Sequence, residues 1–285
     1  MIRSRFLSPE GLATVMAIVN RTPDSFYDQG ATNEYDAAVA RAGEVLKLGA
    51  GIVDIGGVKA GPGDNVDAAA EIERVEPVIA AVREAYPEVW ISVDTWRASV
   101  AEVAISAGAN IVNDTWAGAD PELIEVAGQH KVGYVCSHTG GAIPRTRPHH
   151  VHYDDVVLDV IRETTALAER AVSLGVPEEM VLLDPTHDFG KNTFHGLELL
   201  RRIDEVVATG WPVLMALSNK DFVGETLNRP VNQRVAGTLA ATSWATAHGV
   251  AAFRSHEVAE TVDTIRMTAA IRGDFAPLAT IRGLI

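Results

Sequence analysis

The sequence predicts an α/β protein built as a single (β/α)₈ barrel. Eight short apolar runs recur along the 285 residues, helical patterns fill the intervals between them, and polar residues gather where the runs end. A barrel of this kind typically takes about 250 residues, so the length of the chain suits one such domain. An open, doubly wound parallel sheet is the second fold that the same alternation allows.

The eight apolar runs are typical of strands buried on both faces. Each is rich in β-branched residues and nearly continuous in its apolar part, as in a parallel sheet that helices cover on its faces. In chain order the runs span residues 14–20, 51–57, 89–95, 110–114, 132–138, 180–186, 212–218 and 250–256.

Amphipathic patterns predict helices between these strands. Tyr35, Val39, Ala42 and Leu46 share one helical face, and Gly49 can end that helix. The same spacing recurs in Val100, Val103, Ala104 and Ala107 before Gly108, and in Val262, Ile265 and Ala269 after the last strand. No linker, low-complexity tract or repeat interrupts the alternation, so we predict one domain over residues 1–285.

Composition excludes several classes of function. The net charge of −14 and the absence of a basic block argue against a nucleic-acid partner. No stretch approaches the about 18 apolar residues of a membrane span, and the N-terminus does not resemble a signal peptide. Cys136 is the single cysteine and falls within a predicted buried strand, which indicates a packed thiol and a reducing compartment. We therefore expect a cytoplasmic protein.

Polar residues cluster at the carboxyl ends of the predicted strands. In a barrel these ends meet at one mouth, where such enzymes build their active sites. Asp and Asn there also cap helices and make turns, and Asp114 is a good example of that alternative. The set joins acids and amides, which suit the edge of a heteroaromatic ring, to basic groups that suit an anion. In strand order its members are Asn20, Asp54, Asp94, Asn113 with Asp114, His138, Asp184, Ser218 with Lys220, and Arg254 with His256.

Several of these stretches resemble the signatures of dihydropteroate synthases. MAIVNRTPDSFYDQG resembles the first signature, and DIGG followed by PG resembles the second. SVDT, NIVND, LLDP with FGK, SNK and RSHEVAETVD follow in matching order, so the resemblance covers residues 14–272. It implies a (β/α)₈ barrel, usually a homodimer, that joins 6-hydroxymethyl-7,8-dihydropterin pyrophosphate to p-aminobenzoate and releases pyrophosphate.

The resemblance also implies a pterin pocket formed by four residues. Asp94 and Asp184 would accept hydrogen bonds from the pterin, Asn113 would both donate and accept, and Lys220 would donate to the ring carbonyl and a ring nitrogen. Catalysis would fall to Asp184, Lys220 and Arg254. The C–O bond to pyrophosphate breaks early in the expected mechanism, and Asp184 would stabilise the resulting pterin cation electrostatically.

The departing pyrophosphate would be held by three further positions. The resemblance assigns this role to Asn20, Arg254 and His256, with Mg²⁺ bridging the phosphate oxygens. Magnesium takes few protein oxygens and keeps water and phosphate as its other ligands, so Asn20 alone can serve as the protein ligand.

Three loops depart from the family pattern. Where the family continues DIGG as ESTRPGA, this chain has Val58, Lys59, Ala60 and Gly61, so a hydroxyl and a guanidinium that could grip phosphate are absent. A lysine point charge does not reproduce the bidentate fork of an arginine. After the sixth strand DPGFGFGK becomes DPTHDFGK, which introduces His187 and Asp188, and after the seventh SRKS becomes SNKD, which introduces Asn219 and Asp221.

The altered loops lead to the hypothesis of a dihydropteroate-synthase-like protein whose synthase activity is weak or lost. Added carboxylates at Asp188 and Asp221 would repel p-aminobenzoate, at a cost of several kcal/mol per close contact for an effective dielectric constant of ~20. The alternatives are a non-catalytic pterin- or pyrophosphate-binding or regulatory protein and a fully active synthase. A methyltransferase-type pterin binder is a third possibility, although the chain has no further domain for a cobalamin.

Other conspicuous residues carry weaker signals. His149, His150 and His152 suggest a metal site, but no second ligand cluster at zinc-like spacing supports it, and a solvated loop explains them better. Trp96 and Trp116 lie just past strand ends, where they either flank the mouth or pack in the core. No phosphate-binding GK[ST] loop and no G-x-G-x-x-G motif is present.

Overall fold

The computed structural model describes residues 2–22, 33–59, 61–146 and 152–282 and confirms the predicted (β/α)₈ barrel. All strand pairings are parallel, and the sheet order is β6-β5-β4-β3-β2-β1-β8-β7. A parallel bridge between Leu183 and Val213 joins β6 to the segment before β7 and closes the ring. The strands are β1 Thr14–Asn20, β2 Ile52–Gly56, β3 Trp90–Asp94, β4 Ile111–Asp114, β5 Gly133–Ser137, β6 Val181–Asp184, β7 Leu214–Met215 and β8 Ala252–Ser255.

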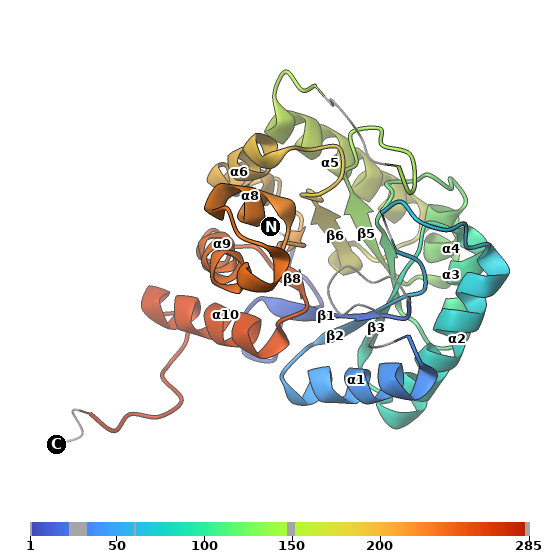
Figure 1. Ribbon diagram of the computed structural model, residues 1–285, viewed down its shortest axis with the longest axis horizontal. Coiled ribbons are helices and arrows are strands. Elements are labelled where there is room, and N and C mark those ends of the chain that lie inside the picture. The colour runs from blue at the N-terminus through green and yellow to red at the C-terminus, as the bar shows by residue number, and fades with distance from the viewer. Residues whose placement is uncertain (1, 23–32, 60, 147–151, 283–285) are drawn as a thin grey trace.

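Helices surround the strands on the outside, as Figure 1 shows. Two helices lie between β6 and β7 and two between β7 and β8, and short 3₁₀ turns precede β6 and α9. The helices are α1 Tyr35–Lys47, α2 Ala68–Ala85, α3 Ala98–Ser106, α4 Leu123–His130, α5 Val156–Leu174, α6 Thr193–Arg201, α7 Ile203–Val207, α8 Asp221–Leu227, α9 Val235–Ala247 and α10 Val258–Arg272; the 3₁₀ turns are η1 Glu178–Met180 and η2 Val231–Gln233.

Local sequence fixes the ends of the longer helices. The Asp67 carboxylate accepts a hydrogen bond from the Ala70 N–H at the start of α2, and Asp155 accepts from the N–H groups of Val157 and Leu158 at the start of α5. Helix α5 ends at Gly175, whose φ of 113° lies in the left-handed region that glycine adopts without strain.

Two apolar cores result from the alternation of side chains along the strands. Residues that point outward pack against the helices, and residues that point inward fill the base of the barrel. The inner core consists of Phe6, Met16, Ile52, Ile111, Val135, Met180, Leu182, Leu214 and Ala252, with Trp90 beside it. The inward-facing polar residues Asp54, Asp94 and Asn113 lie beyond this apolar base, nearer the carboxyl ends of their strands.

Two details of the predicted elements differ in the structure. The buried face of α1 is centred on Ala38, Ala42 and Val45, whereas Tyr35 is exposed and lies beside the Arg21 guanidinium. The seventh strand comprises only Leu214 and Met215 instead of residues 212–218. Pro212 has no N–H to donate to a neighbouring strand, which explains why regular pairing does not extend to that end.

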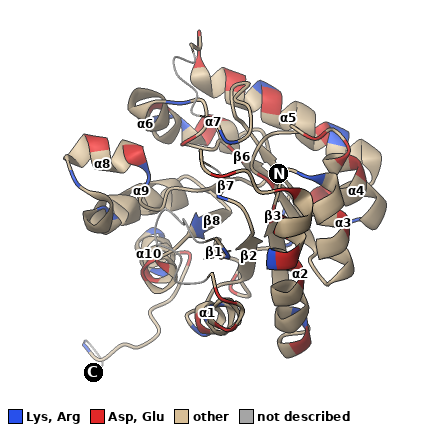
Figure 2. Ribbon diagram, turned by 45° about the vertical axis from the view of Figure 1, so that its right-hand side comes forward, with Lys and Arg blue, Asp and Glu red and all other residues tan. Residues whose placement is uncertain are grey.

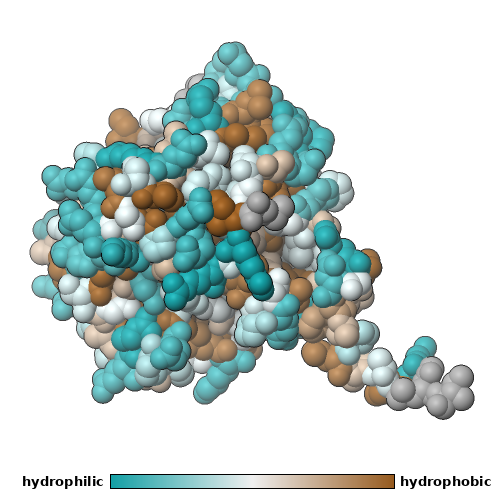
Figure 3. All heavy atoms as spheres, turned by 180° about the vertical axis from the view of Figure 1, so that it is seen from behind, coloured by the Kyte–Doolittle hydropathy of each residue, from teal (hydrophilic) through white to brown (hydrophobic). Residues whose placement is uncertain are grey.

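The C-terminal segment leaves the barrel after α10. Residues 274–282 extend away from the helices, which is visible in Figures 1 and 3, and Leu278 and Ile281 are exposed. Within the described part of the chain, no helix combines the length and apolar character that crossing a bilayer requires.

Candidate functional site

Arg254 connects two acidic side chains at the centre of the barrel. Its Nε donates to Asp54 Oδ2 at 2.6 Å, and its Nη2 donates to Asp94 Oδ2 at 2.7 Å. Figure 2 shows blue colouring on β8, the strand Ala252–Ser255 to which Arg254 belongs. Burial alone would lower the pKa of Arg254, but the attraction of Asp54 and Asp94 outweighs it and raises the pKa. The three side chains therefore form a largely buried ionic network that crosses from β8 to β2 and β3.

Two neutral side chains extend this network toward β4. Asn113 Nδ2 lies 3.4 Å from both carboxylate oxygens of Asp54, and Thr115 Oγ1 donates to Asp94 Oδ1 at 2.5 Å. Burial raises the pKa of Asp94 to about 6, even though the Arg254 charge opposes that shift. Near neutral pH the carboxylate is thus ionised, but it is close enough to its pKa to respond to mild acid.

Asp184 occupies the end of β6 with only part of its hydrogen-bonding capacity used. Its Oδ1 accepts from the Thr186 N–H at 2.8 Å, and the side chain is buried. Burial raises the pKa of this carboxyl group, and Thr186, Lys191, Lys220 and Arg254 oppose the shift. A carboxylate with free lone pairs in such a position can accept hydrogen bonds from a ligand or stabilise a developing cation.

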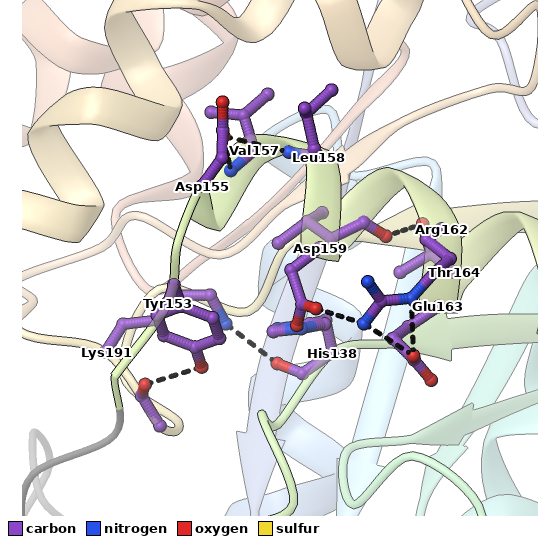
Figure 4. A network of polar contacts seen from close by, with 12 residues as sticks. His138, Tyr153, Asp155, Val157, Leu158, Asp159, Arg162, Glu163, Thr164 and Lys191 are labelled. Carbon is purple, nitrogen blue, oxygen red and sulfur yellow. Dashed lines mark hydrogen bonds and ion pairs between the residues drawn. The ribbon is translucent and has the colours of Figure 1, made fainter.

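A buried lysine fixes the loops beside Asp184. Lys191 Nζ donates to the backbone oxygens of His138, Thr186 and Phe189 at 2.9, 3.1 and 3.1 Å. Burial lowers the pKa of Lys191 to about 7. Figure 4 shows the contact with His138, whose Nε2 lies 3.0 Å from Asp159 Oδ2. The lysine of the FGK motif therefore joins the β5 and β6 loops.

His138 is correspondingly directed away from the mouth. Its imidazole is buried against α5, and burial lowers its pKa to about 4, so it is neutral at pH 7. Asp159 in turn contacts Arg162 on the surface of α5, as Figure 4 shows. A cavity of about 760 Å³ lies beside this network, and its lining includes Ser137, His138 and Asp159.

Lys220 is held by one of the residues that depart from the family pattern. Its Nζ lies 2.6 Å from Asp188 Oδ2, in the loop between β6 and α6. Neighbouring His187 is buried against Phe222, and burial lowers its pKa to about 3. The altered β6 loop thus supplies both a counterion for Lys220 and a neutral buried imidazole.

Asn219 and Asp221, which depart from the family pattern after β7, also have partners within the protein. Asn219 Nδ2 donates to Glu257 Oε1 at 2.5 Å, and Ser218 Oγ donates to Glu257 Oε2 at 2.7 Å. Asp221 pairs with Arg234 across 2.9 Å. The position that carries arginine in the family pattern therefore holds a buried amide bonded to Glu257, and its backbone lies in the left-handed region at φ 54°.

The residues expected to hold pyrophosphate lie at the ends of β1 and β8. Asn20 is half-buried, and a Cβ placed on Gly56 would lie 3.1 Å from its Oδ1, so glycine at that position leaves room for the amide. His256 follows β8, and its backbone N–H donates to Ser218 Oγ at 3.3 Å. Among the described residues there is no group of three or more His, Cys, Asp or Glu that could hold a metal ion.

The structure also places the remaining residues that the sequence singled out. Asp114 serves a turn, because its carboxylate accepts from the N–H groups of Trp116 and Gly118. Trp116 is buried and packs edge-on against Phe189, with ring centroids 4.5 Å apart. Cys136 is buried, and its burial raises the thiol pKa well above the ordinary value. His152 is exposed, whereas His149, His150 and Ala60 lie outside the described residues.

Sequence reasoning missed Thr115 and Glu257, and it gave Asp54 no partner. Thr115 follows NIVND directly, and Glu257 follows RSH, so proximity to a strand end is the signal that could have found them. The link between Asp54 and Arg254 joins residues 200 positions apart and had no local signal.

Comparison with known proteins agrees with this geometry. The sequence model of the family described as "Pterin binding enzyme" matches residues 16–256. The chain is 59% identical to inactive dihydropteroate synthase 2 of Mycobacterium leprae over 95% of this chain and 94% of that protein. It is 37% identical to dihydropteroate synthase of Escherichia coli K12, over 90% of each protein. The crystal structure of Yersinia pestis dihydropteroate synthase with a sulfonamide drug complex superimposes with a TM-score of 0.88 at 36% identity, over 95% of this chain and 98% of that one. Eight parallel strands with acidic, amide and basic residues at one mouth, together with these matches, show that the chain belongs to the family of pterin binding enzymes.

Proposed function

We propose that this chain is a dihydropteroate-synthase-like protein that binds a pterin pyrophosphate, with synthase activity that is weak or lost. The observation that carries the proposal is the ion pair between Lys220 and Asp188 in a site that otherwise keeps its acids, amide and arginine. The relative from Mycobacterium leprae, which is 59% identical, is itself described as inactive, and this description supports the proposal.

In this proposal the pterin lies across the mouth of the barrel. Asp94 and Asp184 accept hydrogen bonds from its donors, Asn113 donates and accepts, and Lys220 donates with an N–H group that Asp188 does not occupy. Asp184 is suited to stabilise a pterin cation, because it is buried and retains acceptor capacity beyond its bond from the Thr186 N–H. Any residual turnover would depend on Asp184, Lys220 and Arg254.

Pyrophosphate would contact Asn20, Arg254 and His256. Arg254 already spans Asp54 and Asp94, so an anion must compete with two carboxylates for the same guanidinium. The donor set fits Mg²⁺ only through the Asn20 amide oxygen, with water and pyrophosphate as the remaining ligands. Bound there, Mg²⁺ would neutralise charge on the leaving group.

We further propose a cytoplasmic homodimer. The dimer is expected from the family, and the single buried Cys136 fits a reducing compartment. Chemical crosslinking and sedimentation analysis would test the dimer independently of ligand binding.

Two experiments separate this proposal from its alternatives. Complementation of a strain that lacks dihydropteroate synthase should fail with this chain and succeed with the Escherichia coli enzyme as a matched control. Calorimetry with pterin pyrophosphate, pyrophosphate and p-aminobenzoate, each alone, should detect binding of the first two and weak or no binding of the third. Full complementation would instead identify an active synthase, and absence of all binding would exclude a pterin-binding role.

A further inference from the structure

Ser137 carries a buried hydroxyl that no described residue satisfies. The residue ends β5, its exposed fraction is 1%, and its Oγ has no hydrogen-bond partner among the described residues. Burying a hydroxyl without a partner costs free energy, so such groups in native proteins call for an explanation such as a ligand or water.

The alternation of side chains directs Ser137 into the barrel. Tyr134 and Cys136 belong to the outer core against the helices, whereas Val135 belongs to the inner core. Ser137 is two residues beyond Val135 and therefore shares its inward face. The outward direction of His138, which reaches Asp159 on α5, fits the same alternation.

The register of the sheet places Ser137 beside the proposed pterin groups. Ser137 is paired with Asp184 on β6, and one step deeper Val135 is paired with Asn113 on β4. The hydroxyl thus lies on the wall between the carboxylate of Asp184 and the amide of Asn113, at the level of the mouth.

The order of strands matches the order of groups along the edge of a pterin. Around the barrel, β7 is followed by β6, β5, β4 and β3. Along the pterin edge the carbonyl is followed by a ring N–H, the exocyclic amine, an unprotonated ring nitrogen and the next ring position. If Lys220 faces the carbonyl and Asp184 the ring N–H, the next group, the amine, meets β5. The residues that carry this correspondence, in order, are Lys220, Asp184, Ser137, Asn113 and Asp94.

We propose that the Ser137 hydroxyl accepts a hydrogen bond from the exocyclic amine of the pterin. This inference rests on the proposed function and extends it, because it makes Ser137 a residue that distinguishes 2-amino heterocycles from analogues without the amine. A hydroxyl accepts where a methyl group cannot, so Ser137→Ala removes the interaction with little change in shape.

Ser92 provides a matched control. It is also fully buried, and its Oγ also lacks a partner among the described residues. It faces inward like Asp94 but lies two residues deeper on β3, where it is paired with Ile111 and Asp54. Ser92→Ala therefore removes an equivalent buried hydroxyl from below the proposed ligand.

The test is calorimetric titration of the wild-type chain and both variants with 6-hydroxymethylpterin and with its 2-deamino analogue. Ser137→Ala should weaken binding of the pterin about three- to tenfold and leave binding of the analogue unchanged. Ser92→Ala should change neither affinity, and thermal unfolding should show that both variants fold.

Each contrary result has a distinct meaning. Unchanged pterin affinity in Ser137→Ala, or an equal loss for both compounds, would overturn the role of Ser137 while the proposed function stands. Failure of the wild-type chain to bind 6-hydroxymethylpterin would overturn the proposed function and this inference together.

Discussion

The Lys220 ammonium lies 2.6 Å from an Asp188 carboxylate oxygen, and both side chains are half-buried. The sequence suggested that Asp188 would act on p-aminobenzoate by repulsion. In the structure the Asp188 charge is already neutralised by Lys220. We therefore expect Asp188 to act mainly on pterin binding, through Lys220, rather than on p-aminobenzoate. A lysine ammonium has three N–H donors, and this ion pair occupies one of them and draws the group toward Asp188, so we expect it to weaken donation to a ring carbonyl of the pterin.

Replacing Asp188 should therefore strengthen pterin binding. Asp188→Asn removes the charge with little change in size, and we expect about two- to fivefold tighter binding of pterin pyrophosphate, as for loss of a partly exposed ion pair. Asp221→Asn is the control, because Asp221 pairs with Arg234 rather than with Lys220. Calorimetry measures the affinity of each variant for pterin pyrophosphate. Equal effects of the two substitutions would show that Asp188 does not act through Lys220.

Pterin affinity should depend on pH through Asp94. Burial raises the pKa of Asp94 to about 6, so the carboxylate that accepts from the pterin becomes protonated as the pH falls from 7 to 5. Binding should weaken over this interval in the wild-type chain, and Asp94→Asn should bind weakly with a flatter pH profile. A wild-type affinity that is constant from pH 7 to 5 would contradict this assignment.

The raised pKa of Asp94 affects the stability of the fold in the opposite direction from ligand binding: lower pH should weaken pterin binding but stabilise the folded chain. The folded chain holds a proton on Asp94 between about pH 4 and 6, where the unfolded chain has released it. The contribution of Asp94 to the free energy of unfolding is thus fully present below this interval and is lost as the pH rises through it. Comparing wild type with Asp94→Asn by urea denaturation isolates that contribution.

The buried histidines should make the protein sensitive to acid. Burial lowers the pKa of His187 to about 3 and that of His138 to about 4. Between about pH 4 and the ordinary histidine value near 6.5, the unfolded chain binds protons that the folded chain excludes, so stability falls as the pH falls. Each such histidine contributes a slope of about 1.4 kcal/mol per pH unit.

His187→Phe should remove one of these slopes. The substitution keeps a flat ring in the contact with Phe222 and has no titrating group. Urea denaturation at pH 6 and at pH 4.5 should show a smaller loss of stability in the variant than in wild type. The exposed His152 offers a control in His152→Phe, which should leave the pH dependence unchanged. An identical pH dependence in His187→Phe and wild type would refute the role of His187.

Arg254 should matter for stability as well as for ligands. Arg254→Met leaves the buried Asp54 and the largely buried Asp94 without their cation, and breaking such a network typically costs about 3–5 kcal/mol. Arg201→Met breaks a more exposed pair with Glu198 and should cost about 1 kcal/mol or less. Urea denaturation measures both, and similar losses would mean that the central network contributes little.

Much of the fold followed from sequence because strand burial has a local signal. Continuous apolar runs placed all eight strands, and only the seventh was much shorter than predicted. The face of α1 was harder to predict, because small residues such as Ala38 pack closest to the sheet while the larger Tyr35 remains outside. Hydrophobic periodicity considers only the type of each residue, whereas packing also depends on how closely the helix backbone approaches the sheet.

The candidate site was predictable as a set of residues but not as a set of contacts. The strand ends brought Asp94, Asn113 and Arg254 into one network, as the barrel geometry required. The pairing of Lys220 with Asp188 depends on the path of the β6 loop, which local sequence does not specify. His138 belonged to the same set of strand ends but points outward, because it lies one residue past an inward-facing position.

Restoring family-like residues in the three altered loops should recover some synthase activity. The combined variant carries Ala60→Thr, Gly61→Arg, Asp188→Gly and Asp221→Ser. A Cβ at position 61 would lie 3.8 Å from the Lys59 Cε, an ordinary distance, so a side chain can begin there without a clash at its Cβ. Dihydropteroate formation, followed by chromatography, should rise at least about tenfold over the wild-type chain, because the substitutions return phosphate-binding groups and release Lys220. The pair Asp188→Gly with Asp221→Ser alone should improve pterin binding but yield less product. If the combined variant binds pterin pyrophosphate tightly yet forms no more product than wild type, the defect lies in the barrel rather than in its loops.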